Sequence, residues 1–272
     1  MKIAIFMKQV PALSQGDMDK KTGVMIRAGL PSIANVYDIA ALETALRIKE
    51  KIGAHVTVFT MGPEKAEEVI KEAFAIGADD GYLICDKAFA GSDVLATSYT
   101  LMQAVKFAGC FDLILCGKQT TDGDTAQVSG ALAKWLNIPH MNWANELIEI
   151  TESDIKVKCQ LDGRLSVIWA AFPCVISVEK SIFTPRMPSL KLKMAARKKE
   201  IKTIGLCNFD DKNENHYGLK GSATKVKSIF PPESTQKHNI INKNGKEAAD
   251  YIYDILKNMK LLEEPKVNDY RQ

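Results

Sequence analysis

Apolar, strand-like runs alternate with amphipathic, helix-like stretches in the first half of the sequence, and this alternation limits the possible folds most. The runs typical of buried strands are residues 2–10, 55–60, 81–85 and 112–116. The stretches with helical periodicity are residues 38–52, 64–76, 92–107 and 128–135. Such alternation predicts an α/β fold with a mostly parallel, Rossmann-like sheet and helices on both of its faces.

The second half of the sequence departs from this pattern. Asp162-Gly163 predicts a hairpin turn, and short strands that would extend the sheet are expected at residues 145–151, 155–161, 165–171 and 173–180. From residue 184 the chain is basic and irregular, from residue 206 it is polar, and one amphipathic helix is expected at residues 244–260. We therefore expect an α/β domain at residues 1–205 and an extended C-terminal arm at residues 206–272.

This arm has too few apolar residues to form a core of its own. A segment of that kind needs a surface on which to lie. The residues leave two alternatives open, because the arm could wrap its own domain or could grip a partner.

Bulk composition excludes several classes of protein. The 272 residues are 46% hydrophobic and 25% charged, with a net charge of +3, so electrostatics gives no reason to expect nucleic-acid binding. No stretch reaches the roughly 18 apolar residues of a membrane-spanning helix. The N-terminus resembles a strand rather than a signal peptide. We expect no membrane span and a cytoplasmic location.

The six cysteines form no C-x-x-C pair, and several stand in apolar runs. They are Cys85, Cys110, Cys116, Cys159, Cys174 and Cys207. We expect buried, reduced thiols rather than a metal site or a disulfide framework.

One loop combines a strand end, small polar residues and a helix start. It reads Cys116-Gly117-Lys118-Gln119-Thr120-Thr121-Asp122-Gly123-Asp124-Thr125-Ala126-Gln127 and leads into Val128. A helix N-terminus offers unpaired N–H groups and the positive end of its dipole, and Gly123 and Ala126 let the backbone approach a ligand closely. The loop predicts phosphate binding. It could instead be an acidic cap, because Asp122 and Asp124 would repel a phosphate unless they cap amides or bond ribose hydroxyls.

Two familiar nucleotide motifs are absent from the sequence. There is no G-x-x-x-x-G-K-[ST], and Lys118 precedes the loop, so it cannot act as a P-loop lysine. The first strand is followed by Met7-Lys8-Gln9-Val10-Pro11 rather than by G-x-G-x-x-G. An ordinary dinucleotide-binding dehydrogenase is therefore disfavoured.

Four segments are expected to converge at the carboxyl edge of the sheet, where such folds bind ligands. They are Asn35-Val36-Tyr37-Asp38, Met61-Gly62, residues 89–93 and the loop after the fourth strand. Together they predict a pocket for an adenine nucleotide. Each alone has an ordinary structural explanation as a helix cap, a core residue or a turn. No catalytic set of side chains is evident, so a bound cofactor would carry any chemistry.

At these residues the chain resembles the beta subunit of electron-transfer flavoprotein along nearly its whole length. Lys8-Gln9-Val10-Pro11 resembles the exit of that family's first strand, and residues 35–43 resemble its N-P-x-(D/C)-x-x-A-(L/V)-E segment, with Val36 in place of Pro. Gly117-Lys118-Gln119-x-x-Asp122-Gly123-Asp124-Thr125-Ala126-Gln127 resembles its most specific motif. Residues 188–199 resemble its basic loop, with Lys191 where Pro is common.

The resemblance implies an adenine-nucleotide α-hydrolase-like sheet and two possible ligands. Ordinary members hold AMP in this pocket. Electron-bifurcating members hold a whole FAD, which takes a hydride from NADH and sends one electron to the alpha-subunit FAD and a dehydrogenase, and the other to ferredoxin. Gly91-Ser92-Asp93-Val94-Leu95-Ala96-Thr97-Ser98-Tyr99-Thr100 resembles the bifurcating form, so the resemblance favours FAD over AMP.

The resemblance also assigns roles to residues in the pocket. The backbone of Phe6, the segment Asn35 to Asp38 and Met61 would surround the adenine side. Residues 122–128 would hold the phosphates through backbone amides and the Thr125 hydroxyl. Gly91, Asp93 and Thr97 would lie near the flavin ring.

Partners follow from the resemblance as well. The arm would wrap an alpha subunit, and the basic loop would dock a flavin dehydrogenase of the acyl-CoA or 2-hydroxy acid type, with Leu190 as its apolar anchor and Lys191, Met194 and Arg197 around it. Alternatively, this loop could be an ordinary charged surface that is exposed to solvent and binds no partner. Two other functions stay open, a subunit that carries a structural AMP and a stand-alone regulatory domain that binds an adenine nucleotide.

Overall fold

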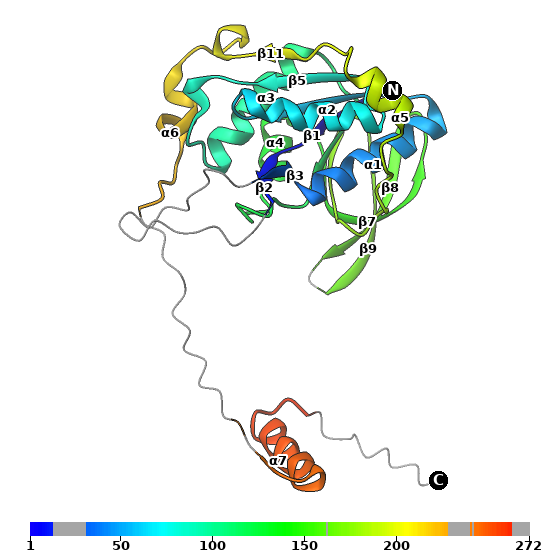
Figure 1. Ribbon diagram of the computed structural model, residues 1–272, viewed down its shortest axis with the longest axis vertical. Coiled ribbons are helices and arrows are strands. Elements are labelled where there is room, and N and C mark those ends of the chain that lie inside the picture. The colour runs from blue at the N-terminus through cyan, green and yellow to red at the C-terminus, as the bar shows by residue number, and fades with distance from the viewer. Residues whose placement is uncertain (13–30, 162, 228–239, 241, 263–272) are drawn as a thin grey trace. The chain divides into compact units, whose positions relative to one another are not determined.

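A nine-stranded sheet carries most of the chain in the computed structural model, which describes residues 1–12, 31–161, 163–227, 240 and 242–262 (Figure 1). In spatial order its strands are β11 (Lys202–Ile204), β5 (Asp80–Ile84), β4 (His55–Met61), β1 (Lys2–Phe6), β6 (Leu113–Gly117), β10 (Cys174–Val178), β7 (His140–Ile150), β8 (Asp154–Leu161) and β9 (Arg164–Ala171). Neighbours from β11 to β7 are parallel, whereas β8 and β9 are antiparallel additions. The expected mostly parallel sheet is confirmed.

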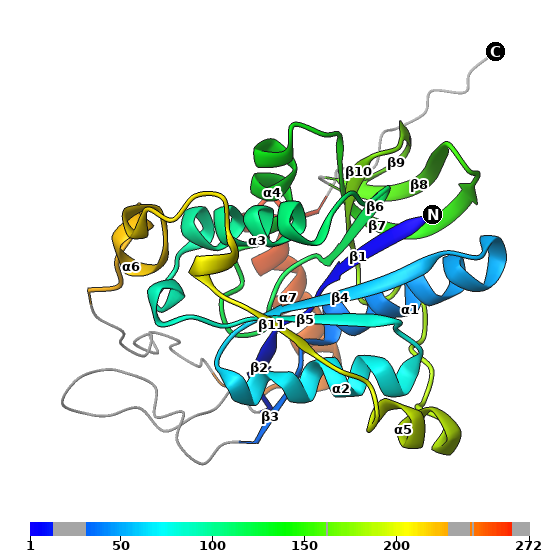
Figure 2. The same cartoon turned by 90° about the horizontal axis from the view of Figure 1, so that it is seen from above.

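Helices cover both faces of this sheet (Figure 2). They are α1 (Val36–Ile52), α2 (Glu67–Ile76), α3 (Val94–Ala108) and α4 (Val128–Leu136). The alternation of β1 shows how the two layers form, because successive strand residues point to opposite faces. Ile3 and Ile5 pack in the core beneath α1 and α2, while Ala4 and Phe6 pack in the core beneath α3 and α4. The predicted α/β architecture follows from this two-sided burial.

The first expected strand, residues 2–10, is divided in the structure. β1 ends at Phe6, and β2 (Gln9–Pro11) pairs instead with β3 (Ser32–Ala34) in a separate antiparallel ribbon. The chain leaves the sheet at Lys8, because the Lys8 backbone N–H donates to the Asp38 carboxylate at 2.8 Å and its carbonyl accepts from Asn35 N at 2.9 Å. A side chain distant in sequence therefore ends the strand.

The antiparallel end of the sheet is built by β7, which begins earlier than the expected 145–151. Its first part pairs in parallel with β10, and its second part pairs antiparallel with β8. β8 and β9 are also antiparallel, with Leu161 opposite Arg164. Gly163 of the expected turn has a φ of 76°, whereas Asp162 lies outside the described residues.

A short helix, α5 (Leu190–Ala196), lies within the stretch that the sequence marked as irregular. The Ser189 hydroxyl caps it by accepting from Leu192 N at 3.1 Å. Ala196 is buried in the core beneath α1 and α2, while most of the helix is exposed. α5 therefore holds the basic segment in a defined conformation on the surface.

Residues 206–227 belong to the α/β unit rather than to a separate arm, which corrects the boundary expected after residue 205. The chain divides into the units Met1–Ile229 and Phe230–Gln272. The short helices η3 (Leu206–Asn208), η4 (Glu214–His216) and α6 (Gly218–Gly221) belong to the first unit. Phe209 and Tyr217 are buried there, each with its ring centroid 5.5 Å from that of Phe89. Two aromatic rings thus anchor a stretch whose average composition is polar.

The second unit contains α7 (Gly245–Asn258), which confirms the helix expected at residues 244–260. The Asn244 side chain caps it by accepting from Glu247 N at 3.0 Å. None of the α7 residues is buried, and its exposed apolar side chains include Ile252, Tyr253 and Ile255.

The remaining helices η1 (Glu64–Ala66) and η2 (Lys87–Phe89) are single turns that precede α2 and α3. All six cysteines are free, and Cys116, Cys159 and Cys174 are buried as expected, whereas Cys110 and Cys207 are exposed. Among the described residues, no helix has both the length and the apolar character that crossing a membrane requires.

Replacing Tyr217 by Ala should lower the free energy of unfolding of the full chain by about 3–5 kcal/mol, because the ring is fully buried and its hydroxyl donates to Asp211 O at 2.6 Å. Urea unfolding measures the loss. Tyr253→Ala, at a tyrosine that is 57% exposed on α7, should change it by less than about 0.5 kcal/mol. Equal effects would show that residues 206–227 do not stabilise the α/β unit.

Candidate functional site

The topological switch point of the sheet lies between β1 and β6. From β1 the chain builds outward through β4 and β5 on one side and then crosses back to β6 on the other. β1 and β6 are parallel neighbours, with Phe6 opposite Cys116. Ligands of open α/β sheets bind in the crevice where such strands diverge. We call the position between the loop after β1 and the loop of residues 117–127 after β6 the crevice, after the ligand site expected there.

Asn35, directly before α1, joins these two loops. Its backbone N–H donates to Lys8 O at 2.9 Å, and its side-chain Nδ2 donates to Gln119 O at 2.8 Å. The Asn35 side chain makes no cap hydrogen bond to its own helix, so the ordinary explanation as an N-cap does not hold. Its buried Oδ1 has no hydrogen-bond partner among the described residues, so an acceptor is left unsatisfied between the two loops.

Asp38, in the first turn of α1, is a buried carboxylate between the same two loops. Its Oδ2 accepts from Lys8 N at 2.8 Å. Burial raises the pKa of Asp38 to about 7, although hydrogen bonds from Lys8 N, the Asn35 side chain and Gly117 N oppose the shift. Asp38 therefore holds the loops together through backbone amides and lies beneath the crevice surface.

Gly117 is required by the close approach of α1 to β6. A Cβ atom at this position would lie 2.3 Å from Asp38 Oδ1 and 2.7 Å from the Tyr37 backbone. No side chain can fit there. This glycine of the motif thus serves packing at the base of the loop.

The rest of the loop is folded by its own polar residues. Asp124 N donates to Thr120 O at 2.9 Å, and Gln119 Nε2 hydrogen-bonds to Asp124 Oδ1. Asp124 and Ala126 have positive φ values of 51° and 54°. Such angles are costly for residues with a Cβ and cluster at binding sites. Gly123, Asp124 and Thr125 are exposed at the top of the loop.

Lys118 points away from this top. Its Nζ is 2.7 Å from Glu179 Oε1, just after β10, and 4.4 Å from the ring centroid of Trp143 on β7. The lysine thus braces the loop against the neighbouring strands. It does not reach toward α4, which agrees with the absence of a P-loop.

The start of α4 is open to an anion. Gln127 occupies the N-cap position and makes no side-chain cap hydrogen bond, whereas Asp93 caps the start of α3 by accepting from Ala96 N at 3.1 Å. The first backbone N–H groups of a helix need partners and lie at the positive end of its dipole. An uncapped start beside an exposed loop of small residues can therefore accept a phosphate group.

The sequence analysis missed one residue of this crevice, Lys8. Its Nζ is 2.8 Å from both carboxylate oxygens of Asp122. The ion pair crosses from the loop after β1 to the loop after β6. The available signal was the position of Lys8 directly after the first strand, but the sequence offers no way to see that Asp122 is its partner.

Comparison with known proteins identifies the family. Residues 22–207 match the model of the electron transfer flavoprotein domain. An electron transfer flavoprotein subunit beta from Thermoanaerobacterium thermosaccharolyticum is 40% identical over 259 residues, which cover 94% of this chain and 98% of that protein. The chain belongs to the electron transfer flavoprotein beta-subunit family.

Two other relatives of this chain carry different names. The caffeyl-CoA reductase-Etf complex subunit CarD from Acetobacterium woodii is 37% identical over 266 residues, covering 96% of this chain and 100% of that protein. The protein FixA from Azotobacter vinelandii is 36% identical over 261 residues, covering 92% of this chain and 93% of that protein. The family likeness thus extends over both units of the chain.

The residues that the resemblance assigns to a flavin ring lie at the start of α3. Gly91, with a φ of 74°, faces Leu219, to which a Cβ atom would come within 3.4 Å. Besides its cap bond, the Asp93 carboxylate accepts from Thr224 N at 2.8 Å and from Thr224 Oγ1 at 2.9 Å. Thr97 is half-buried one turn into the helix. The segment after α6 thus covers the start of α3.

The residues assigned to the adenine side are divided between core and surface. Phe6 is buried with its ring centroid 5.4 Å from that of Phe59, and Met61 is half-buried against the same core. Cys116 is buried, and burial raises the pKa of its thiol. Tyr37 is half-buried, while Val36 is 42% exposed.

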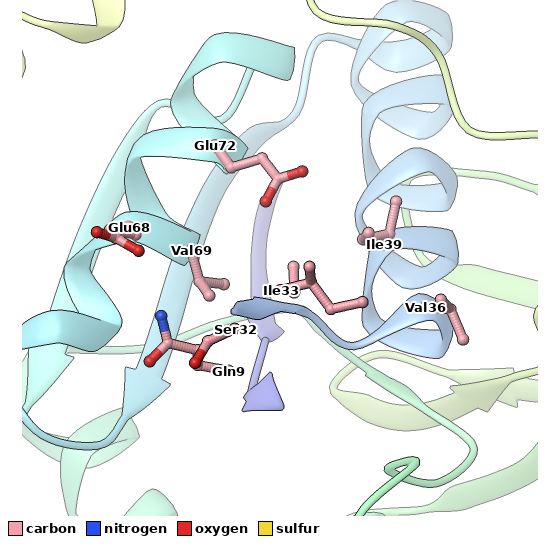
Figure 3. A pocket seen from close by; sticks show the side chains of 9 residues that line it. Gln9, Ser32, Ile33, Val36, Ile39, Glu68, Val69 and Glu72 are labelled. Carbon is pink, nitrogen blue, oxygen red and sulfur yellow. The ribbon is translucent and has the colours of Figure 1, made fainter. Parts of the chain in front are cut away.

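Val36 also lines a hollow of about 350 Å³ between α1 and α2, beneath the β2–β3 ribbon (Figure 3). Ile33, Ile39 and Val69 form its apolar wall, and Glu72 stands at its edge. A second hollow of about 750 Å³ lies around α6. Neither hollow is lined by the loop of residues 117–127, so neither coincides with the predicted nucleotide site.

The loop expected to dock a dehydrogenase presents its apolar side chains to solvent. Leu190 and Met194 are 75% and 62% exposed, and Lys191 and Arg197 are exposed beside them. The segment before α5 is fastened by Arg186, whose Nε donates to Glu43 Oε2 on α1 at 2.8 Å. These four residues are thus exposed on or next to α5, and the segment that leads into α5 is held to α1 by the Arg186–Glu43 contact.

The pKa of Asp38 predicts how stability depends on pH. A carboxyl whose pKa rises from 3.8 to about 7 on folding binds its proton more tightly in the folded chain, so its contribution is fully present below pH 4 and is lost as the pH rises through 7. The free energy of unfolding of the wild type minus that of Asp38→Asn should fall between pH 5 and pH 7, with a slope approaching about 1.4 kcal/mol per pH unit. Urea unfolding at each pH gives this difference, and a difference that rises with pH would contradict the assignment.

Proposed function

We propose that this chain is the beta subunit of a heterodimeric electron transfer flavoprotein and binds FAD in the crevice between the loops after β1 and β6. The observation that carries the proposal is the uncapped start of α4 beneath an exposed loop of small residues. The crevice fits an adenine nucleotide, because the α4 amides suit its phosphates and the orphaned Asn35 Oδ1 suits a hydroxyl or amino donor.

The choice of FAD over AMP rests on the residues at the N-terminus of α3. Residues 91–100 resemble the bifurcating members of the family. α3 and α4 pack against each other, and Trp135 Nε1 in the last turn of α4 donates to Ser98 Oγ in the second turn of α3 at 3.2 Å. In this proposal the flavin end of the ligand would lie toward Thr97, on the helix that packs against α4.

A bound FAD would supply the hydride acceptor for NADH and the branch point from which one electron passes to the alpha-subunit FAD and the other to ferredoxin. The residues of this chain would hold that group in place. The α4 amides and the Thr125 hydroxyl would bind its phosphates, while Asp38 and Asn35 would fix the two loops around it. The protein would act as an electron-transfer subunit in a larger oxidoreductase complex.

Two protein partners are assigned to surfaces of this chain, a flavin dehydrogenase and the alpha subunit. A flavin dehydrogenase would dock on the exposed side of α5, and the name of the relative CarD, which links it to a caffeyl-CoA reductase, supports the acyl-CoA type over the 2-hydroxy acid type. The exposed helix α7, with Ile252 and Ile255 on its surface, would contact the alpha subunit. Family membership and this uncovered helix argue against a stand-alone regulatory domain.

One observation favours a second candidate, a subunit that carries a structural AMP. Leu219 and Thr224 lie against Gly91 and Asp93, so the start of α3 is already covered by the chain itself. An isoalloxazine ring at this place would require that segment to shift. AMP would require no such movement, because its single phosphate can sit at α4.

Extraction of nucleotides from the purified alpha–beta pair decides between the two. We expect two FAD per heterodimer. One FAD together with one AMP would contradict the flavin on this subunit and would support the structural nucleotide. If each heterodimer released one FAD and no second nucleotide, the crevice of this subunit would not be a nucleotide site.

Gly123→Val should lower the nucleotide content of this subunit by at least about tenfold, since a branched side chain on the exposed loop would cover the amides that face the phosphate. Gly245→Val is the matched control, because a Cβ there meets nothing within 4 Å and lies in the other unit. Chromatography of the released nucleotides gives the occupancy. Full occupancy in Gly123→Val would show that the site lies elsewhere.

Leu190→Ala should weaken binding of the flavin dehydrogenase by about tenfold or more, because an exposed aliphatic side chain at the centre of an interface contributes on the order of 1–2 kcal/mol. Leu165→Ala, at a leucine 65% exposed on β9, is the matched control and should leave the affinity unchanged. Titration calorimetry with the intact alpha–beta pair measures both. Equal affinities for the two variants would contradict docking at α5.

A further inference from the structure

The loop proposed to bind an anion carries two carboxylates of its own, Asp122 and Asp124. A carboxylate close to a phosphate opposes its binding by Coulomb repulsion. The structure treats the two acids differently. Asp124 hydrogen-bonds to the neutral amide of Gln119, whereas Asp122 is paired with the ammonium of Lys8.

The Lys8–Asp122 pair has the geometry of a strong ion pair. Lys8 Nζ is 2.8 Å from both Asp122 oxygens, and the Asp122 side chain is only 14% exposed. Burial by itself would raise the pKa of the Asp122 carboxyl, but the Lys8 ammonium holds it below its usual value. Asp122 is therefore ionised, and its charge is compensated within the protein.

The position of Lys8 is set by its backbone. Lys8 N donates to the buried Asp38 carboxylate, and Lys8 O accepts from Asn35 N. Both contacts belong to the start of α1, which also contacts the base of the opposite loop at Gly117. The ammonium thus extends from a fixed point on one side of the crevice to Asp122 on the other.

We propose that Lys8 is a positioning residue of the nucleotide site, which cancels the charge of Asp122 and holds the start of the phosphate loop against β1. The inference rests on the proposed nucleotide function. Lys8 acts through Asp122 rather than by contact with the ligand. The α4 amides would then meet an anion without added repulsion from the Asp122 carboxylate.

This role predicts a dependence on ligand charge. Removing the ammonium with Lys8→Met leaves Asp122 as an unpaired anion, which should weaken binding of AMP about tenfold at low salt, while adenosine, which has no phosphate, should change less than about twofold. The double variant Lys8→Met/Asp122→Asn should regain AMP affinity to within about threefold of the wild type. Asp122→Asn alone, which keeps the ammonium, should bind AMP as tightly as the wild type or more tightly.

The test uses the alpha–beta complex after removal of the nucleotide from this subunit, with AMP and adenosine titrated by calorimetry. Lys49→Met is the matched control, because Lys49 Nζ also bonds both oxygens of an aspartate, Asp79, at 2.6 Å but at the far end of α1. It should leave the affinity for AMP unchanged.

Each outcome has a distinct meaning. If Lys8→Met weakened the binding of AMP and of adenosine equally, the inference would be overturned, and the Lys8–Asp122 pair would only hold the two loops together. Loss of AMP affinity without rescue in the double variant would overturn it in favour of direct contact between Lys8 and the ligand. A wild-type complex that binds neither AMP nor FAD at this subunit would refute the proposed nucleotide site itself, whatever Lys8 does.

Discussion

The buried carboxylate of Asp38 is the interaction on which the candidate site depends. It accepts the Lys8 N–H that turns the chain out of β1, and it lies against Gly117 at the exit of β6. A carboxylate without solvent is stable only where hydrogen-bond donors surround it, so the two loops must come together for α1 to begin as it does. The crevice at the switch point is therefore a consequence of how α1 is anchored.

The same helix links the crevice to the docking surface. Its first turn carries Asp38, and its second carries Glu43, a buried carboxylate bonded by Arg186 and by Arg47 Nε at 2.8 Å. Arg186 in turn fixes the segment before α5. One helix thus fixes both the proposed nucleotide loops and the base of the proposed dehydrogenase surface, so that a change at the start of α1 would affect both.

Charge within the crevice is distributed so that an anion can be accepted. Lys118 is paired with Glu179, Lys8 with Asp122, and Asp124 with a neutral amide. Apart from Asp124, the charged side chains in and beside the loop are paired, and backbone N–H groups remain as the donors for a ligand. This is the arrangement expected where a helix N-terminus, rather than a lysine side chain, holds the phosphate.

Periodicity predicted the order and type of the α/β elements well, because two-sided burial of a parallel sheet leaves a strong apolar pattern in strands such as β1 and β6. Periodicity did not predict the structure where one or two specific contacts decide how a segment folds, whatever its average composition. The polar stretch 206–227 packs on the α/β unit because Phe209 and Tyr217 are buried, and strand 2–10 is divided because Asp38 captures the backbone of Lys8.

The sequence alone determined the fold class and the family likeness and singled out the proposed phosphate loop, since all three depend on residues that are neighbours along the chain. Only the tertiary structure decided that Asn35 bonds the opposite loop instead of capping its helix, that Lys8 neutralises Asp122, and that residues 218–224 cover the start of α3. These contacts join residues from 84 to 131 positions apart, and a pattern of local periodicity holds no information about such pairings.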